Sequence, residues 1–549
     1  MISLPWRKGA IAALRLLLTP AAFYLALFTL LTYPLMLQFS TCLFADKGDG
    51  LQNYWNLWWI NKSVVELHQP FWKTPYLHYP YGTSLIGHTL NPFNGFLAIP
   101  LHFVMSPLQA HNAVVVFSFV AGGVTAFLLA YYVTHSYWPS LMGGSIFTFS
   151  NFHFAHAEGH MQLVSLEWIP LFVLCWYMLL LKPRPLTAVA AALTLFLVAL
   201  CDYYYLFYSA LTACLMVAWY ALRSRDVLFF ATKRYRLPLA IFSAVALATS
   251  GLVAISLLLQ NAADPLIGAH PSEELSLDLL APLIPGGHWR FASLTSGYWS
   301  SLPGNIHESS VHMGISVLAL VVYAVTNRRS ARAFNIGMWC AILMFFLVLS
   351  LGPALRVWGR AVTPSILPYA WLEAALPPLA LSGVPVRMMV MVMLGAAVLA
   401  AVGLKLLLGR ARWWPVPALL AVLMAVEYLP KPLPASQLSA PAYVDVLKGL
   451  KDDKGVLDTV AGGALALYYQ TIHEKPIAFG YIARVPKSVA YIDSQLSEVI
   501  RQKDYVKLQR EFGIRYLVVD AAVDVPCSDP PAARLLYQDE KVKLYDLGP

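Results

Sequence analysis

Charged residues are scarce in this sequence. Only 12% of its 549 residues are Asp, Glu, Lys or Arg, whereas 58% are hydrophobic. Soluble domains carry about 25% charged residues, so this shortage excludes an ordinary soluble domain and predicts an α-helical polytopic membrane protein. The net charge of +9 does not indicate a nucleic-acid partner, because the basic residues are grouped in short loops between apolar runs.

Several sequence signatures are absent as well. The chain contains no Walker-type phosphate loop, no G-x-S-x-G elbow and no C-x-x-C pair. Its six cysteines lack metal-type spacing, and four of them lie within apolar runs, where we interpret them as packing residues. Cys42 and Cys527 both fall on the predicted outer side, which leaves a disulfide between them open. We find no internal repeat.

Apolar runs of about 20 residues are long enough to cross a bilayer as helices. We expect about 11 such helices, and ten of them lie near residues 12–37, 110–134, 163–181, 186–202, 204–222, 239–259, 311–326, 335–353, 386–408 and 413–430. One of two shorter runs, 92–106 or 139–150, supplies the remaining crossing. The basic loops and the N-terminus then face the cytoplasm, as the positive-inside rule requires, and the C-terminus lies outside.

The predicted outer side carries most of the acidic residues. Its loops span residues 38–91, 151–162, 260–310 and 354–384, and all belong to a transmembrane domain at 1–430. After a linker rich in Pro and Ser, three strands are expected at 455–461, 514–521 and 541–547, and helical spacing of apolar residues marks 487–512. We therefore expect a small extracytoplasmic α/β domain over residues 431–549.

The first outer loop contains ADKGDGLQNYWNLWWI, which places Asp46 and Asp49 where the chain leaves the membrane. Asp49 followed by Gln52 approximates a capping box, so Asp49 is interpreted either as a helix cap or as a functional acid. Capping does not account for Asp46. In the functional interpretation, one aspartate takes a proton from an acceptor hydroxyl, and the other orients that hydroxyl or a metal ion.

The second outer loop reads NFHFAHAEGHMQ. His156 and His160 are four residues apart, the spacing of helical zinc ligands, but Gly159 weakens such a helix and no third ligand is evident. A divalent metal ion on His156 and His160 is thus one interpretation. In the other, His156, Glu158 and His160 line a polar substrate pocket that faces the aspartates, joined by His88 and Asn91 from the first loop.

Arginines on the predicted outer side break the positive-inside pattern and need an anion. Arg290 and Arg387 are the main cases, and their anion is either a carboxylate of the protein or the phosphate of a lipid substrate. Glu308, in NIHESSVHMG, precedes a predicted span. Its carboxylate either stabilises the start of that helix or, beside His307 and His312, binds substrate.

Four segments resemble the GT-C superfamily of polytopic membrane glycosyltransferases, in particular its poorly characterised bacterial members with a C-terminal extracytoplasmic α/β domain. These segments are GDGLQN, FAHAEGHMQLVSLEWIPL, SGVPVRMMV and YYQTIHEKPIAFGYIARVP. The resemblance implies sugar transfer from a polyprenyl-phosphate donor, usually with inversion, and a first-loop base at Asp49 or Asp46. It maps the contacts of the carrier phosphate onto Arg387 or Arg290. The family's paired acids of a later loop are replaced here by His156, Glu158 and His160.

The sequence thus predicts a glycosyltransferase of the bacterial inner membrane, with its C-terminal domain in the periplasm. Its partners are a polyprenyl-phosphate sugar donor, a glycan, lipid or protein acceptor, and membrane lipids. The sequence identifies no certain cofactor, and a divalent metal ion is the one candidate. Two other functions are alternatives. One is a transporter or flippase of lipid-linked glycans, which would be expected to show inverted repeats and ionisable residues at the membrane midplane. The other is a non-catalytic assembly subunit.

Overall fold

The computed structural model describes residues 14–548 apart from 225–229, 231, 269, 328, 331–333, 364–366, 377–378, 380, 382, 410–414 and 526–532. Its described residues form two compact units. The helical unit takes in 14–38, 113–254 and 270–433, and the α/β unit takes in 39–112, 255–268 and 434–548. Cys527 and the N-terminal basic residues Arg7 and Lys8 lie outside the described residues.

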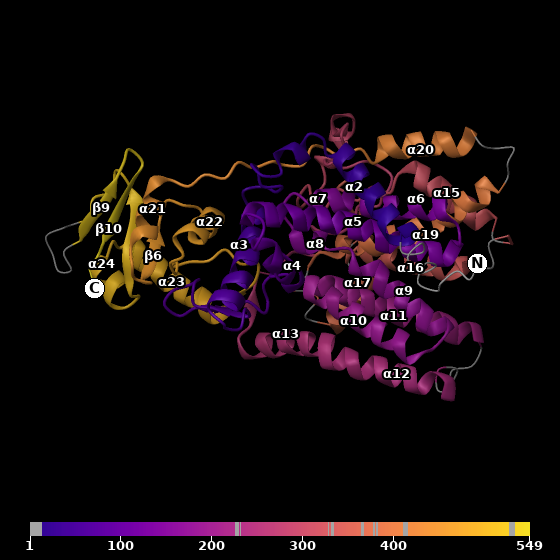
Figure 1. Ribbon diagram of the computed structural model, residues 1–549, viewed down its shortest axis with the longest axis horizontal. Helices are drawn as coiled ribbons and strands as arrows, with labels where there is room; N and C mark the ends of the chain where they lie inside the picture. Colours follow the sequence, from indigo (N-terminus) through magenta and orange to yellow (C-terminus); the bar gives the residue numbers. More distant parts are fainter. Residues whose placement is uncertain are drawn as a thin grey trace, which may run out of the picture. The chain divides into compact units, whose positions relative to one another are not determined.

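The helical unit is built from apolar helices (Figure 1). They are α2 (Thr19–Leu31), α5 (Pro107–Thr134), α6 (Tyr137–Thr148), α9 (Trp168–Leu181), α10 (Pro185–Cys201), α11 (Tyr203–Ser224), α12 (Lys233–Ala246), α15 (Ile315–Thr326), α16 (Ile336–Ser350), α19 (Met389–Leu408) and α20 (Pro415–Glu427). Helix α10 packs against α9, α11 and α12, and the start of α5 extends into the α/β unit.

Helix α19 is the centre of the helical unit. Nearly all its residues are buried, because it is apolar on every face and packs against α6, α15 and α16. The contact with α15 depends on Gly403, where any side chain would collide with the backbone carbonyl of Leu320. The short helix η8 (Pro385–Met388) leads into α19 and carries Arg387.

Six helical stretches are long and apolar enough to cross a membrane: Leu14–Leu31, Pro107–Thr134, Met161–Leu181, Tyr203–Ser224, Lys233–Ala263 and Pro385–Leu408. Four shorter apolar helices accompany them in the described part of the chain. The predicted polytopic helical architecture is therefore confirmed, while the number of crossings stays a prediction. Of the two ambiguous runs, 139–150 overlaps the largely buried helix α6, and 92–106 contains α4 (Pro92–His102) of the α/β unit.

The α/β unit contains a four-stranded sheet of order β6-β8-β10-β9. Strand β6 (Gly455–Asp458) is parallel to β8 (Ile514–Asp520), whereas β10 (Val542–Asp546) is antiparallel to both β8 and β9 (Arg534–Gln538). The other elements of the unit are α3 (Asp49–Asn61), α13 (Leu252–Ala263, shared with the helical unit), α21 (Ala442–Gly449), α22 (Gly463–His473), α23 (Lys487–Arg501), α24 (Tyr505–Arg510), β1 (Lys73–Thr74), β2 (Thr83–Ser84), β3 (Leu266–Ile267) and β7 (Val485–Pro486).

The small C-terminal α/β fold is confirmed, with two differences of detail. The expected helix at 487–512 is interrupted between α23 and α24, where Lys503 has a positive φ of 56° and Asp504 caps α24 through the backbone N–H of Lys507. Strand β9 was not expected, since its sequence RLLYQ is short and does not alternate apolar and polar residues.

A single boundary at residue 430 does not separate the two compact units, because each unit contains segments from separate parts of the chain. Helix α3 of the first loop packs on α22, and the indole N–H of Trp55 donates to Gln470 Oε1 at 2.7 Å. Strand β3 pairs with β7, which joins the 255–268 segment to the same unit. The first loop and the C-terminal residues therefore share one apolar core.

Candidate active site

The HAEGH segment turns between two short helices of the helical unit. His156 ends α7 (Asn151–His156), and His160 precedes α8 (Met161–Val164), so the two histidines do not share one helix and Gly159 lies in the turn between the two short helices. The two rings still meet, with 3.2 Å between His156 Nδ1 and His160 Nδ1. Burial is the main cause that holds the pKa of His156 well below its ordinary value, which keeps this ring neutral.

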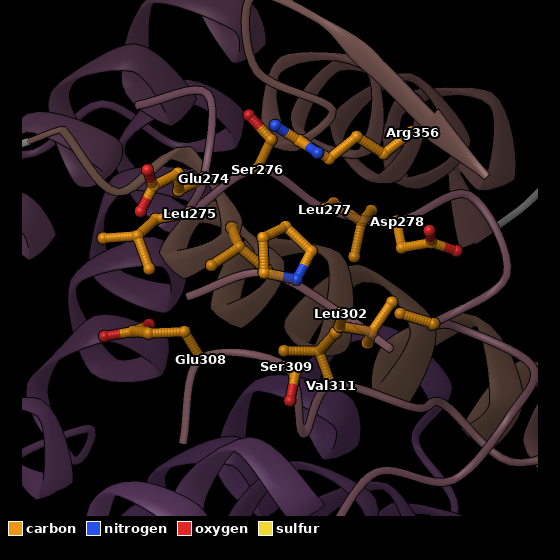
Figure 2. Close-up of a pocket in the computed structure, with 13 residues that line it drawn as sticks. Glu274, Leu275, Ser276, Leu277, Asp278, Leu302, Glu308, Ser309, Val311 and Arg356 are labelled. Atoms are coloured by element: carbon orange, nitrogen blue, oxygen red, sulfur yellow. The ribbon is translucent and has the colours of Figure 1, made fainter. Parts of the chain in front are cut away.

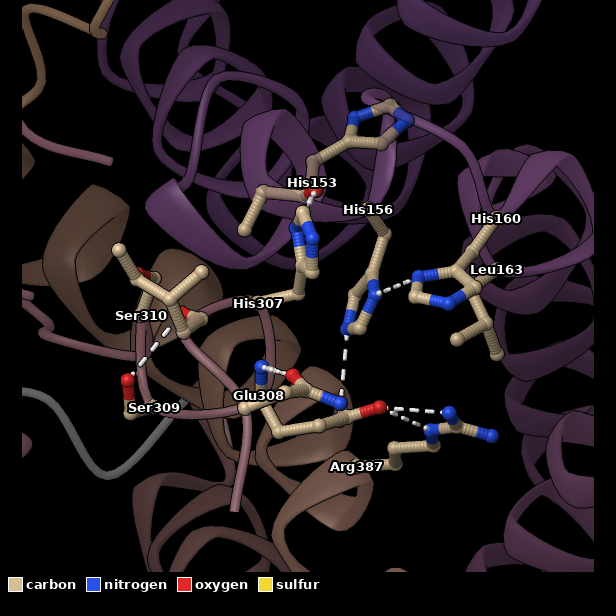
Figure 3. Close-up of polar contacts among 12 residues, drawn as sticks. His153, His156, His160, Leu163, His307, Glu308, Ser309, Ser310 and Arg387 are labelled. Atoms are coloured by element: carbon tan, nitrogen blue, oxygen red, sulfur yellow. Dashed lines mark hydrogen bonds and ion pairs between the residues drawn. The ribbon is translucent and has the colours of Figure 1, made fainter. Parts of the chain in front are cut away.

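Glu308 and Arg387 form a buried ion pair beside these histidines (Figure 3). Glu308 Oε1 accepts from Arg387 Nε at 2.9 Å and from Nη2 at 2.5 Å. The guanidinium also lies 5.0 Å from the centre of the Tyr204 ring. Of the two anions considered for Arg387, the structure therefore supplies the carboxylate of the protein.

Glu308 does not cap the following span. That helix, α15, begins at Ile315, and its N-terminus is held by Glu427, which accepts from the backbone N–H of Ile315 at 2.8 Å and from Ser316 Oγ at 2.5 Å. The second oxygen of Glu308 instead lies 3.7 Å from His156 Nε2. Both atoms are buried and make no hydrogen bond with described residues, so the carboxylate faces the histidine group directly.

A second group adjoins the first. Glu158 Oε1 lies 3.3 Å from His288 Nε2, and Glu158 Oε2 lies 3.9 Å from His307 Nδ1. One ligand atom from each of these three residues falls within 4.8 Å of the others. Although burial opposes ionisation, the hydrogen bond and charge of His288 hold the pKa of Glu158 below its ordinary value. Burial and the neighbouring His288 lower the pKa of His307.

The two groups are continuous. The rings of His160 and His307 have centres 5.6 Å apart, and those of His288 and His307 lie 4.9 Å apart.

Five predicted site residues therefore come together in the helical unit: His156, Glu158, His160, Glu308 and Arg387. His288 was missed, because its proximity to Glu158 is tertiary; a survey of all histidines in the predicted outer loops would have found it. Arg290 is exposed, and its described contact with the unit is a backbone hydrogen bond to Leu429.

The aspartates of the first loop lie in the α/β unit, and their roles differ from the capping interpretation. Asp46, not Asp49, holds the start of α3, since its Oδ1 accepts from the backbone N–H groups of Gly48 at 2.8 Å and Gly50 at 3.0 Å. Asp49 Oδ1 accepts from the hydroxyl of Tyr481 at 2.8 Å. Burial, followed by this hydrogen bond, raises the pKa of Tyr481 to about 12.

His88 and Asn91 support the backbone of the α/β unit. His88 Nδ1 accepts from the backbone N–H of Ala483 at 3.1 Å, which leaves Nε2 to donate to Asn56 Oδ1 at 2.9 Å. Burial lowers the pKa of His88 to about 3. Asn91 has a positive φ of 49° and caps α4 by accepting from the backbone N–H of Asn94. The predicted substrate contacts of both residues stay predictions.

Each unit contains a cavity. In the helical unit a pocket of about 20 Å³ is lined by Glu274, Asp278, Glu308, Ser309 and Arg356 among others (Figure 2), which is room for one water molecule. In the α/β unit an open groove of about 520 Å³ lies between the β1–β2 hairpin, Asp264 and the start of α23. The groove has the volume of a small-ligand site.

Comparison with solved structures identifies the fold. An arabinofuranosyltransferase, AftD, from Mycobacteria superimposes with a TM-score of 0.58 at 13% identity, over 98% of this chain and 42% of that one. An oligosaccharyltransferase from Archaeoglobus fulgidus gives 0.49 at 13% identity, over 92% and 69%. ArnT from Cupriavidus metallidurans, solved with undecaprenyl phosphate, gives 0.42 at 12% identity, over 96% and 98%. The first likeness confirms the predicted GT-C fold.

Sequence comparison adds the family. No curated protein matches the chain in sequence. The model of one family, described as "Domain of unknown function (DUF6311)", matches residues 21–428, which is more than half of the chain and includes every candidate site residue named above except Tyr481. The chain therefore belongs to the DUF6311 family and has a GT-C fold.

Proposed function

We propose that this protein is an inverting glycosyltransferase of the bacterial inner membrane, which moves a sugar from a polyprenyl-phosphate donor to an acceptor on the periplasmic face. The observation that carries the proposal is the buried Glu308, which pairs with Arg387 and faces the buried His156 inside a helical unit of GT-C fold. Ionisable residues in a membrane unit are costly to bury, so a cluster of them marks a functional site. The donor class rests on the motif resemblance.

Asp49 is the proposed general base. Its carboxylate is partly exposed at the start of α3, and the Tyr481 hydroxyl orients one of its oxygens. Asp46 is the weaker candidate, because its Oδ1 is engaged by backbone amides. In the transfer step Asp49 accepts the proton of the acceptor hydroxyl, the acceptor oxygen bonds to the anomeric carbon, and the bond from that carbon to the phosphate oxygen breaks.

The histidine group of the helical unit is the proposed site for the departing phosphate. His156 and His160 are linked to each other and adjoin His307, so the cluster presents ring nitrogens that can donate to phosphate oxygens. Arg387 is the proposed positioning residue for this group, since it fixes Glu308 against His156. The polyprenyl phosphate leaves with the electron pair of the broken bond.

The groove of the α/β unit is the proposed acceptor surface. Lys73, Gln260 and Asp264 contribute polar side chains to it. Gln69 lines the same groove, and its Nε2 is buried with no hydrogen-bond partner among the described residues. A buried donor left without a partner costs about 1–3 kcal/mol, which a sugar hydroxyl would relieve. Gln69→Met is therefore expected to raise KM for the acceptor while kcat stays near its original value.

The test of the activity uses purified protein in proteoliposomes that contain a panel of polyprenyl-phosphate sugars. Asp49→Asn should lower the rate of sugar transfer by about 100- to 10,000-fold, the range of general-base catalysis. Asp524→Asn is the matched control, because that side chain is 89% exposed. Equal rates for the Asp49→Asn variant and the control would overturn the assignment of the base. Lipid translocation without transfer would favour the flippase.

A further inference from the structure

Glu158, His288 and His307 form a set of metal-ligand atoms, and the proposed transfer step assigns no role to Glu158 or His288. They come from three separate segments of the helical unit: the turn after α7, the Gly286-Gly287-His288 turn, and the segment before α15. Their ligand atoms lie within 4.8 Å of one another. Two imidazoles and one carboxylate are a common ligand set of catalytic zinc sites.

Both histidine rings of this set are held in place by a second partner. His288 Nδ1 lies 2.7 Å from Ser310 Oγ, and His307 Nδ1 lies 3.1 Å from the backbone carbonyl oxygen of Ala155. Metal-binding histidines characteristically donate their second ring N–H to such a partner, which fixes the tautomer and the ring orientation. Nε2 of His288 is therefore the nitrogen that this ring offers to a cation, 3.3 Å from Glu158 Oε1. In His307 the nitrogen nearest Glu158 is Nδ1, 3.9 Å from Oε2.

The spacing suits a small cation. Bonds of about 2.0–2.1 Å in a tetrahedron separate neighbouring ligand atoms by about 3.3 Å, which is the observed distance from Glu158 Oε1 to His288 Nε2. The remaining ligand atom lies within 4.8 Å of the other two. It therefore needs to approach by at most about 1.5 Å, which a side-chain rotation can supply. Glu158 and His307 keep 16% and 23% of their side chains exposed, so one coordination position faces outward.

We propose that Glu158, His288 and His307 bind a divalent cation of the zinc class, with an open position for a water or a substrate oxygen. This set differs from the His156 and His160 pair expected from the sequence, whose Nδ1 atoms face each other. The role of the cation rests on the proposed function: it would hold an oxygen of the donor phosphate near His160. Binding of the cation does not depend on that function.

The experiment measures metal binding in the full-length protein in detergent, without donor or acceptor. The protein is stripped with a chelator and titrated with Zn²⁺ by calorimetry, and Co²⁺ is added to a second sample. We expect one equivalent of Zn²⁺ and the visible absorption of four-coordinate Co²⁺. Glu158→Gln and His288→Gln should each weaken Zn²⁺ affinity by at least about 100-fold, and Ser310→Ala by about 10- to 100-fold.

His68→Gln is the matched control, because His68 is exposed and lies in the other unit. It should leave affinity unchanged, and unfolding temperatures of metal-free samples establish that each variant is folded. Zn²⁺ affinity unchanged in folded Glu158→Gln and His288→Gln protein would overturn the proposal, as would a metal-free chain that takes up no Zn²⁺. An affinity lost only in a His156→Gln variant would assign the ion to the other pair instead. Failure of sugar transfer alone would leave the metal site standing.

Discussion

The candidate site is held by single side chains, because the Arg387 guanidinium pairs with Glu308 and the other carboxylate oxygen of Glu308 faces His156. His156, Glu158 and His160 were found because they are close along the chain. Glu308 and Arg387 were found because charge stands out in an apolar sequence, but their pairing across 79 positions is a tertiary fact. A capping role was one of two interpretations left open for Asp49, and the structure gives the hydrogen bond at the start of this helix to Asp46, because the helix follows the turn at Gly48.

The ion pair between Arg387 and Glu308 leads to a prediction about stability. Arg387→Met leaves the Glu308 carboxylate buried without its cation, so we expect the free energy of unfolding to fall by about 3–5 kcal/mol. The double variant Arg387→Met with Glu308→Leu should recover most of this loss, because no unpaired charge remains buried. Unfolding in detergent, followed by tryptophan fluorescence, measures both. A double variant as unstable as the single one would contradict the prediction.

His88 predicts a pH dependence of stability. Its pKa in the folded protein is about 3, below its ordinary value of about 6.5, so the unfolded chain binds the proton more readily and acid favours unfolding. Between pH 6.5 and pH 5 this residue should remove about 2 kcal/mol of stability. His88→Gln should lose about that much less over the same interval. Equal losses in both proteins, measured by chemical unfolding at the two pH values, would contradict this.

Among the secondary-structure elements, long apolar helices such as α19 were predictable, because their length and composition are enough to identify them. Short elements were not: β9 has no strand pattern and is placed by its pairing with β10. The run at 239–259 is part of a longer helical stretch, which continues through a π-helical turn to Ala263 and includes the polar Gln260 and Asn261. Helix ends therefore depended on local residues that the overall hydropathy does not resolve.

The contact between α15 and α19 gives a prediction at this scale. Gly403→Ala places a methyl group against the carbonyl of Leu320, so we expect a loss of about 1–3 kcal/mol, although alanine alone favours a helix. Gly409→Ala is the control, since its nearest neighbours lie 3.5 Å from the added carbon. The unfolding temperatures of the two variants test this prediction. A Gly403→Ala protein as stable as the control would contradict the prediction, because α15 and α19 would then have accommodated the methyl group without loss of stability.

At the scale of the whole molecule, the sequence correctly predicted a membrane-helical architecture and a C-terminal α/β fold. It did not predict that the first outer loop shares a core with the C-terminal residues. Trp55, Trp59 and Leu85 pack with Val456 and Leu467 in that core. Hydrophobic patterning marks each strand or helix, but it carries no information about which distant segments pack together.

This shared core predicts that residues 431–549 do not fold cooperatively alone. Without α3, the apolar faces of α22 and the sheet lose the buried indoles of Trp55 and Trp59. We expect the isolated fragment to show helical far-ultraviolet circular dichroism but no sharp thermal transition. Adding residues 39–112 through a flexible linker should restore a transition. A sharp transition in the isolated fragment would contradict the shared core.

The most direct test of sugar transfer from a polyprenyl-phosphate donor is a mass balance on that lipid. Proteoliposomes with the protein, a polyprenyl-phosphate sugar and a membrane extract as acceptor are followed by mass spectrometry. We expect the donor to be converted to free polyprenyl phosphate in step with the appearance of a glycosylated product of inverted configuration, and we expect Asp49→Asn to stop both changes. A donor that remains intact with every sugar of the panel, or that merely changes leaflet, would contradict it.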